Sequence, residues 1–296
     1  MDDRAGRVVL GTAQLGMEYG VANHLGMPSP ANADALLELA WLSGVTCWDT
    51  AQAYGHSEEV IGSYLECNPD CQVRVISKLD PKLAGRSADE VYRAVIASAE
   101  RVAGRLDAML LHNSSMLKDW ENGLGDALER CRDEGIIATI GASVYTTDEF
   151  RRALAQSEIR LIQAPFNVLD RALFSEGLFE QAQNKGVEIH LRSIFLQGLL
   201  VMDTSQLPSE MSFAYQSISE WQGLCRRLNR LPADVALQFA CQTVPDAFLV
   251  LGCETQDQLA RNLQHLDSTP LEPEALDHIM SLQPTEERVI RPYLWN

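Results

Sequence analysis

Short apolar runs alternate with longer segments of helical spacing along almost the whole chain. The runs are nearly continuous in apolar residues, as expected of strands buried on both faces of a parallel sheet. Most are separated by about 20 to 35 residues, enough for a crossover helix between parallel strands. The eight runs are Arg7–Leu10, Val45–Trp48, Val73–Ser77, Ala108–Leu111, Ile136–Ile140, Leu161–Ala164, Val187–Leu191 and Phe248–Leu251.

The segments between these runs carry clear helix signals. Ser87 to Glu90 and Thr146 to Glu149 both match a capping box, in which a hydroxyl and a carboxylate satisfy free backbone amides at a helix start. Ser57, followed by two glutamates, predicts another N-cap. Several predicted helices end at a glycine directly before the next run, namely Gly44, Gly135 and Gly186.

The segment before the eighth run is the longest connection. It predicts two helices, Met211–Leu228 and Ala233–Gln242, and after the eighth run comes a helix over Glu274–Leu282 with an aromatic tail. Eight strand–helix units predict an α/β fold: a single (β/α)₈ TIM barrel domain over residues 1–296, with this long insert and a C-terminal helix and tail. An open doubly wound sheet is the alternative.

Composition narrows the class of protein. A net charge of -17 and a pI near 4.7 weigh against nucleic acid and anionic membranes as main partners, so neither is expected. No run approaches the ~20 apolar residues of a membrane span, and the start Met-Asp-Asp-Arg lacks an apolar signal region, so we expect a cytoplasmic protein. The seven cysteines complete no zinc spacing, so no metal is expected. The sequence does not indicate an oligomeric state.

Four polar residues lie where the predicted strands end. Asp49 ends the second strand, Tyr54 follows on its loop, Lys78 ends the third strand and His112 ends the fourth. The carboxyl ends of all strands of a parallel barrel form one rim, where the active site is built. The four side chains are therefore predicted to meet at one site.

These residue types suit the reduction of a carbonyl group. A phenol has a pKa of about 10, which a neighbouring ammonium lowers, and a carboxylate can hold that ammonium in place. A neutral imidazole can hydrogen-bond a substrate oxygen. The group predicts protonation of a carbonyl oxygen as a hydride arrives at its carbon, and a nicotinamide cofactor must supply the hydride.

Each residue taken alone also has a structural interpretation. Asp49 could cap a turn, Tyr54 could anchor a loop and His112 could be a satisfied histidine at the barrel mouth. Lys78 could pair with Asp80. The four together, at this spacing, favour the catalytic interpretation.

The chain resembles the aldo-keto reductase superfamily in a series of motifs that spans almost its whole length. The most specific is Asp49-Thr-Ala-Gln-Ala-Tyr-Gly-His-Ser-Glu58. The others are Gly11–Gly16, Ile76–Lys78, Leu110–His112, Ile140–Ser143, Gln163–Asn167, Gln197–Leu200, and Gly252 followed by Gln258–Asn262. The resemblance implies a barrel that reduces aldehydes or ketones with NADPH or NADH. It assigns Tyr54 as general acid, Lys78 and Asp49 as the pair that lowers its pKa, and His112 as the residue that orients the substrate oxygen.

The resemblance also implies cofactor-binding residues: Gly11, Thr12, Ala13, Asp49, Ser143, Gln163, Arg192, Ser193, Gly252, Gln258 and Asn262. Three positions depart from the family pattern. Val144 replaces an asparagine that contacts the carboxamide, and Arg192 replaces an aromatic ring that stacks on the nicotinamide. Glu254 lies where NADPH-selective members place a lysine or arginine. The family thus favours NADPH, whereas the local chemistry favours NADH unless Arg261 turns inward, so use of both is expected.

Gln14–Asn23 and Arg192–Gly198 further resemble a bacterial branch that accompanies surface-polysaccharide and nucleotide-sugar enzymes. This resemblance implies a small sugar-like or other polar carbonyl substrate. The candidates to line its pocket are Tyr19, Asn23, His24, Tyr293 and Trp295.

Two other functions are compatible with these residues. One is a cofactor-sensing or interaction protein on the same barrel, suggested by the altered positions 144 and 254. The other is a barrel lyase or isomerase that uses Lys78 as a Schiff base.

Overall fold

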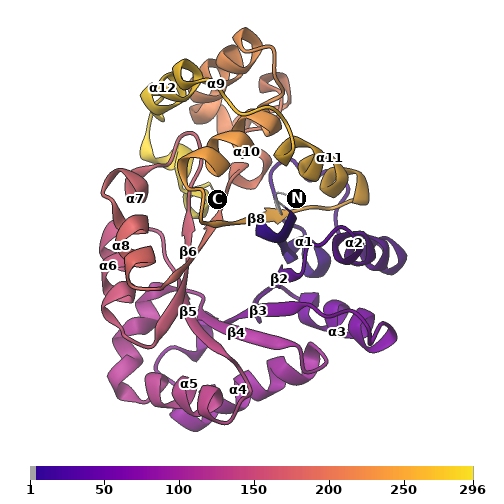
Figure 1. The fold of residues 1–296 in the computed structure, drawn as a ribbon, viewed down its shortest axis with the longest axis vertical. Coiled ribbons are helices and arrows are strands. Elements are labelled where there is room, and N and C mark those ends of the chain that lie inside the picture. Colours follow the sequence, from indigo (N-terminus) through magenta and orange to yellow (C-terminus); the bar gives the residue numbers. More distant parts are fainter. Residues whose placement is uncertain (1–4, 296) are drawn as a thin grey trace.

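The computed structural model describes residues 5–295, which form a closed barrel of eight parallel strands in chain order (Figure 1). Each strand pairs with the next, and β8 pairs with β1. The TIM barrel prediction is therefore confirmed, and the open sheet is wrong. The strands are β1 Val8–Gly11, β2 Cys47–Asp49, β3 Arg74–Leu79, β4 Leu106–Leu111, β5 Thr139–Ser143, β6 Ile159–Pro165, β7 Glu188–Arg192 and β8 Phe248–Gly252.

Helices surround the strands on the outside (Figure 1). Both predicted capping boxes are present, at Ser87 and at Thr146. Ser57, by contrast, does not cap its helix, because its hydroxyl donates to the carbonyl of Thr12 at 2.9 Å. The helices are α1 Ala13–Gly16, α2 Pro30–Leu42, α3 Ser57–Cys67, α4 Ala88–Arg101, α5 Leu124–Asp133, α6 Thr147–Ala155, α7 Ala172–Ser175, α8 Leu178–Asn184, α9 Tyr215–Arg227, α10 Pro232–Thr243, α11 Gln256–Leu266 and α12 Pro273–Ser281.

The fifth strand is the least accurate prediction. It was expected over Ile136–Ile140 but begins only at Thr139. The amide of Ile136 donates back to the carbonyl of Cys131 at 2.9 Å, so Ile136 still belongs to the turn that ends α5. An apolar run alone cannot distinguish such a helix-ending turn from the strand that follows it.

The apolar residues form two clusters. The larger one lies between the barrel and its helices. The smaller one is contributed only by strands and includes Val9, Ile76, Leu110 and Leu161. Alternation along each strand directs these side chains into the barrel, where they form a packed floor below the carboxyl ends. Polar groups at those ends therefore open only toward the loops.

The long insert and the C-terminal segment are also present as predicted. α9, α10 and α12 gather on one side of the barrel (Figure 1). After α12 the chain forms two 3₁₀ turns, Glu287–Ile290 and Pro292–Leu294, joined by Arg291. The buried guanidinium of Arg291 donates to Asp170 Oδ2 at 2.7 Å, which anchors this tail to the β6–α7 loop. No helix within residues 5–295 is long and apolar enough to cross a membrane.

Candidate active site

A cavity of about 410 Å³ opens at the carboxyl ends of the strands. All four predicted catalytic residues and every predicted cofactor-binding residue line it, although they come from seven of the eight strands and from the loops and helices after them. These residues are Gly11, Thr12, Ala13, Asp49, Tyr54, Lys78, His112, Ser143, Gln163, Arg192, Ser193, Gly252, Gln258 and Asn262. The structure thus brings the whole predicted set to one place.

A buried ion pair lies at the base of the cavity. Lys78 Nζ is 2.6 Å from Asp49 Oδ2 and also donates to the carbonyl of Thr50 at 2.8 Å. Asp49 Oδ1 accepts from Gln163 Nε2 at 2.8 Å. Burial lowers the pKa of Lys78, and the charge of Asp49 opposes this effect. Lys78 therefore pairs with Asp49 rather than with Asp80, and these two contacts occupy the Nζ that would have to attack a carbonyl carbon to form a Schiff base.

Tyr54 lies above this pair. Lys78 Nζ is 5.0 Å from the centroid of the Tyr54 ring, and the His112 ring meets it edge-on at 5.6 Å. Burial raises the pKa of the Tyr54 phenol, the charge of Asp49 raises it further, and only Arg192 opposes them. The expectation of a lowered pKa is therefore wrong, because desolvation of the phenolate outweighs the attraction of nearby cations. The phenol carries its proton at neutral pH.

His112 is neutral at the same pH. Burial lowers its pKa to about 4, and the positive charges of Lys78 and Arg192 act in the same direction against Asp49. Its Nδ1 is buried and has no hydrogen-bond partner among the described residues. A neutral imidazole beside a protonated phenol leaves uncharged hydrogen-bonding groups on this wall of the cavity.

Two glycines fix the loop that carries Tyr54. A Cβ added at Gly16 would lie 1.9 Å from the carbonyl oxygen of Tyr54. A Cβ added at Gly55 would lie 2.0 Å from the carbonyl oxygen of Gly16, and Gly55 has a φ of +55°. The backbones of α1 and of the β2–α3 loop are therefore in direct contact, which only glycine allows at both positions.

We expect Gly16→Ala to lower turnover at least about tenfold, because the new methyl group must push Tyr54 away from Lys78 and His112. Overpacking of this kind costs about 1–3 kcal/mol in free energy of unfolding. Gly223→Ala is the matched control, since a Cβ at this α9 position meets no atom closer than 3.5 Å. Steady-state rates and thermal unfolding would measure both effects. Full activity of Gly16→Ala would show that the contact does not position Tyr54.

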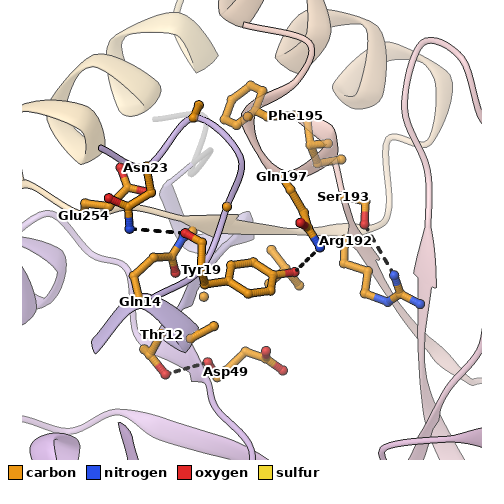
Figure 2. Close-up of a pocket in the computed structure, with 18 of the residues that line it drawn as sticks. Thr12, Gln14, Tyr19, Asn23, Asp49, Arg192, Ser193, Phe195, Gln197 and Glu254 are labelled. Carbon is orange, nitrogen blue, oxygen red and sulfur yellow. Dashed lines mark hydrogen bonds between the residues drawn. The ribbon is translucent and has the colours of Figure 1, made fainter. Parts of the chain in front are cut away.

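Arg192 extends from the end of β7 into the cavity (Figure 2). Its guanidinium donates to the carbonyl of Val144 at 2.9 Å and to Ser193 Oγ at 3.3 Å. The guanidinium carbon also lies 4.0 Å from the ring centroid of Tyr145. The Val144 side chain is apolar and fully buried in the outer core. Position 144 therefore gives a ligand no side-chain amide in place of the asparagine of the family pattern.

The loop between α1 and α2 bridges the cavity to the loop after β7. The amide of Val21 donates to the carbonyl of Gln197 at 3.0 Å, and Gln197 Nε2 lies 3.2 Å from Tyr19 Oη (Figure 2). Tyr19 and Asn23 line the cavity, as predicted. His24 lies instead at a separate depression beside Glu18.

The two aromatic residues of the tail do not line the cavity. Tyr293 packs edge-on against Tyr145, with the ring centroids 5.3 Å apart. The indole of Trp295 donates to the carbonyl of Arg288 at 2.8 Å. These predictions are wrong because the tail folds back on itself and supports the cavity wall from behind.

The far end of the cavity meets the N-terminus of α11. Thr255 caps this helix by accepting from the amide of Gln258, and Gln258 Oε1 accepts from the amide of Glu254 at 2.7 Å. Asn262 Nδ2 lies 3.5 Å from Cys253 Sγ. Free backbone amides at a helix N-terminus favour anionic groups such as phosphates. The first turn of α11 therefore fits the phosphate and ribose part of a dinucleotide.

Sequence reasoning missed several residues of the cavity wall, among them Gln14 and Tyr145. Gln14 on α1 is buried, and its amide lies where a side chain at Gly252 would be, 2.5 Å from such a Cβ. Tyr145 reaches the cavity through its contact with Arg192. Gln14 lay within a motif of the resemblance, but no chemistry singled it out. Within the described part of the chain, no group of three or more His, Cys, Asp or Glu side chains is arranged to hold a metal ion.

Comparison with known proteins identifies the family. The family model "Aldo/keto reductase family" matches residues 7–284. D-threo-aldose 1-dehydrogenase from Pseudomonas sp is 27% identical in an alignment 302 residues long, which spans 86% of this chain and 90% of the relative. The NADH-specific methylglyoxal reductase of Escherichia coli (strain K12) is 26% identical over 270 residues, covering 79% of this chain and 82% of the relative.

The solved structures show the same fold. The holo form of an aldo-keto reductase from Bacillus halodurans superposes with a TM-score of 0.76 over 96% of this chain and 95% of that chain, at 23% identity. The family match covers nearly the whole barrel and includes the rim residues described above. The chain therefore belongs to the aldo/keto reductase family and is an NAD(P)H-dependent oxidoreductase.

Proposed function

We propose that this protein reduces a small polar, sugar-like aldehyde or ketone to an alcohol, with Tyr54 as the general acid. The observation that carries the proposal is the buried Lys78–Asp49 pair, which lies beside a protonated Tyr54 and a neutral His112 on one cavity. The names of the two relatives support a carbonyl substrate of this class. The two names do not identify the compound on which this chain acts.

Each catalytic residue has a separate role in the proposed reaction. The nicotinamide cofactor, when bound, supplies the hydride. Tyr54 and His112 hydrogen-bond the carbonyl oxygen, and Tyr54 donates its proton as charge develops on that oxygen. Its raised pKa keeps the phenol protonated until an alkoxide, a stronger base, forms. The ammonium of Lys78 then stabilises the phenolate, and Asp49 fixes Lys78 in position.

The polar residues along the cavity support a dinucleotide in an extended arrangement. Ser143 and Gln163 lie next to the catalytic group, where they would hold the carboxamide. The Gln163 amide nitrogen already donates to Asp49, so its oxygen is the group that remains for a ligand. Gln258 and Asn262, at the other end, would hold the phosphates and the adenine.

Glu254 supports a preference for NADH over NADPH. It lines the cavity directly before α11, where the adenosine ribose would lie. A carboxylate there accepts hydrogen bonds from ribose hydroxyls and repels a 2′-phosphate. Arg261 also lines the cavity and would offset part of this repulsion, so we propose that both cofactors bind and that NADH binds more tightly.

We expect Glu254→Lys to tighten NADPH binding at least about tenfold and to change NADH binding much less, because it replaces a repelled charge with an attracting one. Glu274→Lys makes the same charge change on α12, away from the cavity, and should alter neither affinity. Titration of each cofactor against tryptophan fluorescence measures both. An unchanged ratio of the two affinities in Glu254→Lys would place the ribose elsewhere.

The function itself is tested by following the oxidation of NADH and NADPH with a panel of carbonyl compounds. Aldoses and methylglyoxal, which appear in the names of the relatives, belong in the panel. We expect turnover of at least one small polar carbonyl compound. Tight cofactor binding without turnover of any compound would instead favour a cofactor-sensing protein on this barrel.

A further inference from the structure

Arg192 brings a positive charge into the cavity, and it forms no ion pair with a carboxylate of residues 5–295. The ammonium of Lys78 is paired with Asp49. The polar contacts described for Arg192, by contrast, are with uncharged groups: the carbonyl of Val144, the hydroxyl of Ser193 and the ring of Tyr145. None of these contacts neutralises the charge of Arg192, although the protein as a whole is strongly negative.

The charge of Arg192 acts at the reacting centre. It pulls the pKa of Tyr54 and that of His112 downward, so its field reaches both groups that face the carbonyl oxygen. A hydride donor must contact the carbon of the same carbonyl group. The donor ring therefore lies within the field of Arg192, whether or not the guanidinium stacks directly on it.

Arg192 is also held in place. Hydrogen bonds fix the guanidinium at Val144 and Ser193, and Tyr145 covers it at 4.0 Å. Tyr293 supports Tyr145 from behind. A fixed guanidinium cannot turn away to relieve repulsion from a second positive charge, as a free surface arginine would.

The nicotinamide ring is neutral when reduced and carries a positive charge when oxidised. We propose that Arg192, held against Tyr145, makes the site bind the reduced cofactor in preference to the oxidised one. The inference rests on the proposed function, because it requires the nicotinamide ring beside Tyr54. Two unit charges about 6 Å apart at an effective dielectric constant of about 20 repel strongly enough to change an affinity at least about tenfold.

The test compares the dissociation constants of NADH and NAD⁺ in three variants of the intact protein. NADH is titrated against tryptophan fluorescence, and NAD⁺ is measured by its displacement of NADH. Arg192→Gln removes the charge, and Arg192→Lys keeps the charge but removes the guanidinium plane. Tyr145→Leu keeps Arg192 and removes the ring behind it. Circular dichroism and thermal unfolding show that each variant is folded.

We expect the ratio of the NAD⁺ to the NADH dissociation constant to fall about tenfold in Arg192→Gln and to fall less in Arg192→Lys, which keeps the charge but not the contacts that fix it. Tyr145→Leu should lower the ratio partially, because the guanidinium is then free to move. An unchanged ratio in Arg192→Gln, with both cofactors bound, would overturn this inference and leave the proposed function intact. Failure of the wild-type protein to bind either cofactor would overturn both.

Discussion

Replacing Tyr54 with phenylalanine is expected to lower kcat by about 10²- to 10⁴-fold, the usual contribution of a positioned general acid. The ring stays in place, because its packing against His112 and Lys78 does not depend on the hydroxyl. The dissociation constant of NADH should therefore remain close to that of wild type. Single-turnover kinetics with a reduced cofactor would show that the chemical step, rather than cofactor binding, has slowed.

Tyr19→Phe is the matched control for this prediction. Tyr19 is a second phenol on the same cavity, and burial raises its pKa to about 12. Its hydroxyl contacts Gln197 rather than the catalytic group, so its loss weakens the bridge between two loops and removes no proton donor. An effect of Tyr19→Phe equal to that of Tyr54→Phe, or full activity of Tyr54→Phe, would mean that another group protonates the substrate.

The catalytic group was predictable from the sequence because the barrel imposes a simple rule. Once the second and third strands are identified, their ends must share a rim, so Asp49 and Lys78 must be neighbours. The structure gives 2.6 Å between their charged atoms. The rule tolerates errors of one or two residues at strand starts, because the site depends only on where strands end.

Contacts made by loops were not predictable in the same way. Tyr19 and Gln197 are 178 residues apart, and no periodicity links them. Tyr145 owes its place to the guanidinium of Arg192, a contact that depends on rotamers rather than on strand order. The pKa of Tyr54 was also beyond sequence reasoning, because its sign depends on how completely the folded chain excludes water from the phenol.

The Lys78–Asp49 pair allows the effect of catalytic residues on the free energy of unfolding to be measured directly. Both side chains are almost completely buried, at 1% and 4% exposure. Lys78→Met is expected to lower the free energy of unfolding by about 3–5 kcal/mol, because it leaves a buried carboxylate with the amide of Gln163 as its remaining partner. Asp49→Asn should cost less, because burial already lowers the pKa of Lys78 and the amine can lose its proton.

The double variant Lys78→Met/Asp49→Asn separates stability from function. With both charges removed, no uncompensated ion remains, and the free energy of unfolding should return to within about 2 kcal/mol of wild type. Activity should be strongly reduced in all three variants, because Lys78→Met and the double variant lack the cation beside Tyr54 and Asp49→Asn lacks the carboxylate that holds Lys78 in position. Urea unfolding gives the energies, and Arg130→Met, which breaks an exposed pair with Glu134, should cost less than about 1 kcal/mol. A double variant that loses as much free energy of unfolding as the two single variants together would contradict this expectation. The two residues would then stabilise the barrel independently, and the loss in each single variant would not come from a broken pair.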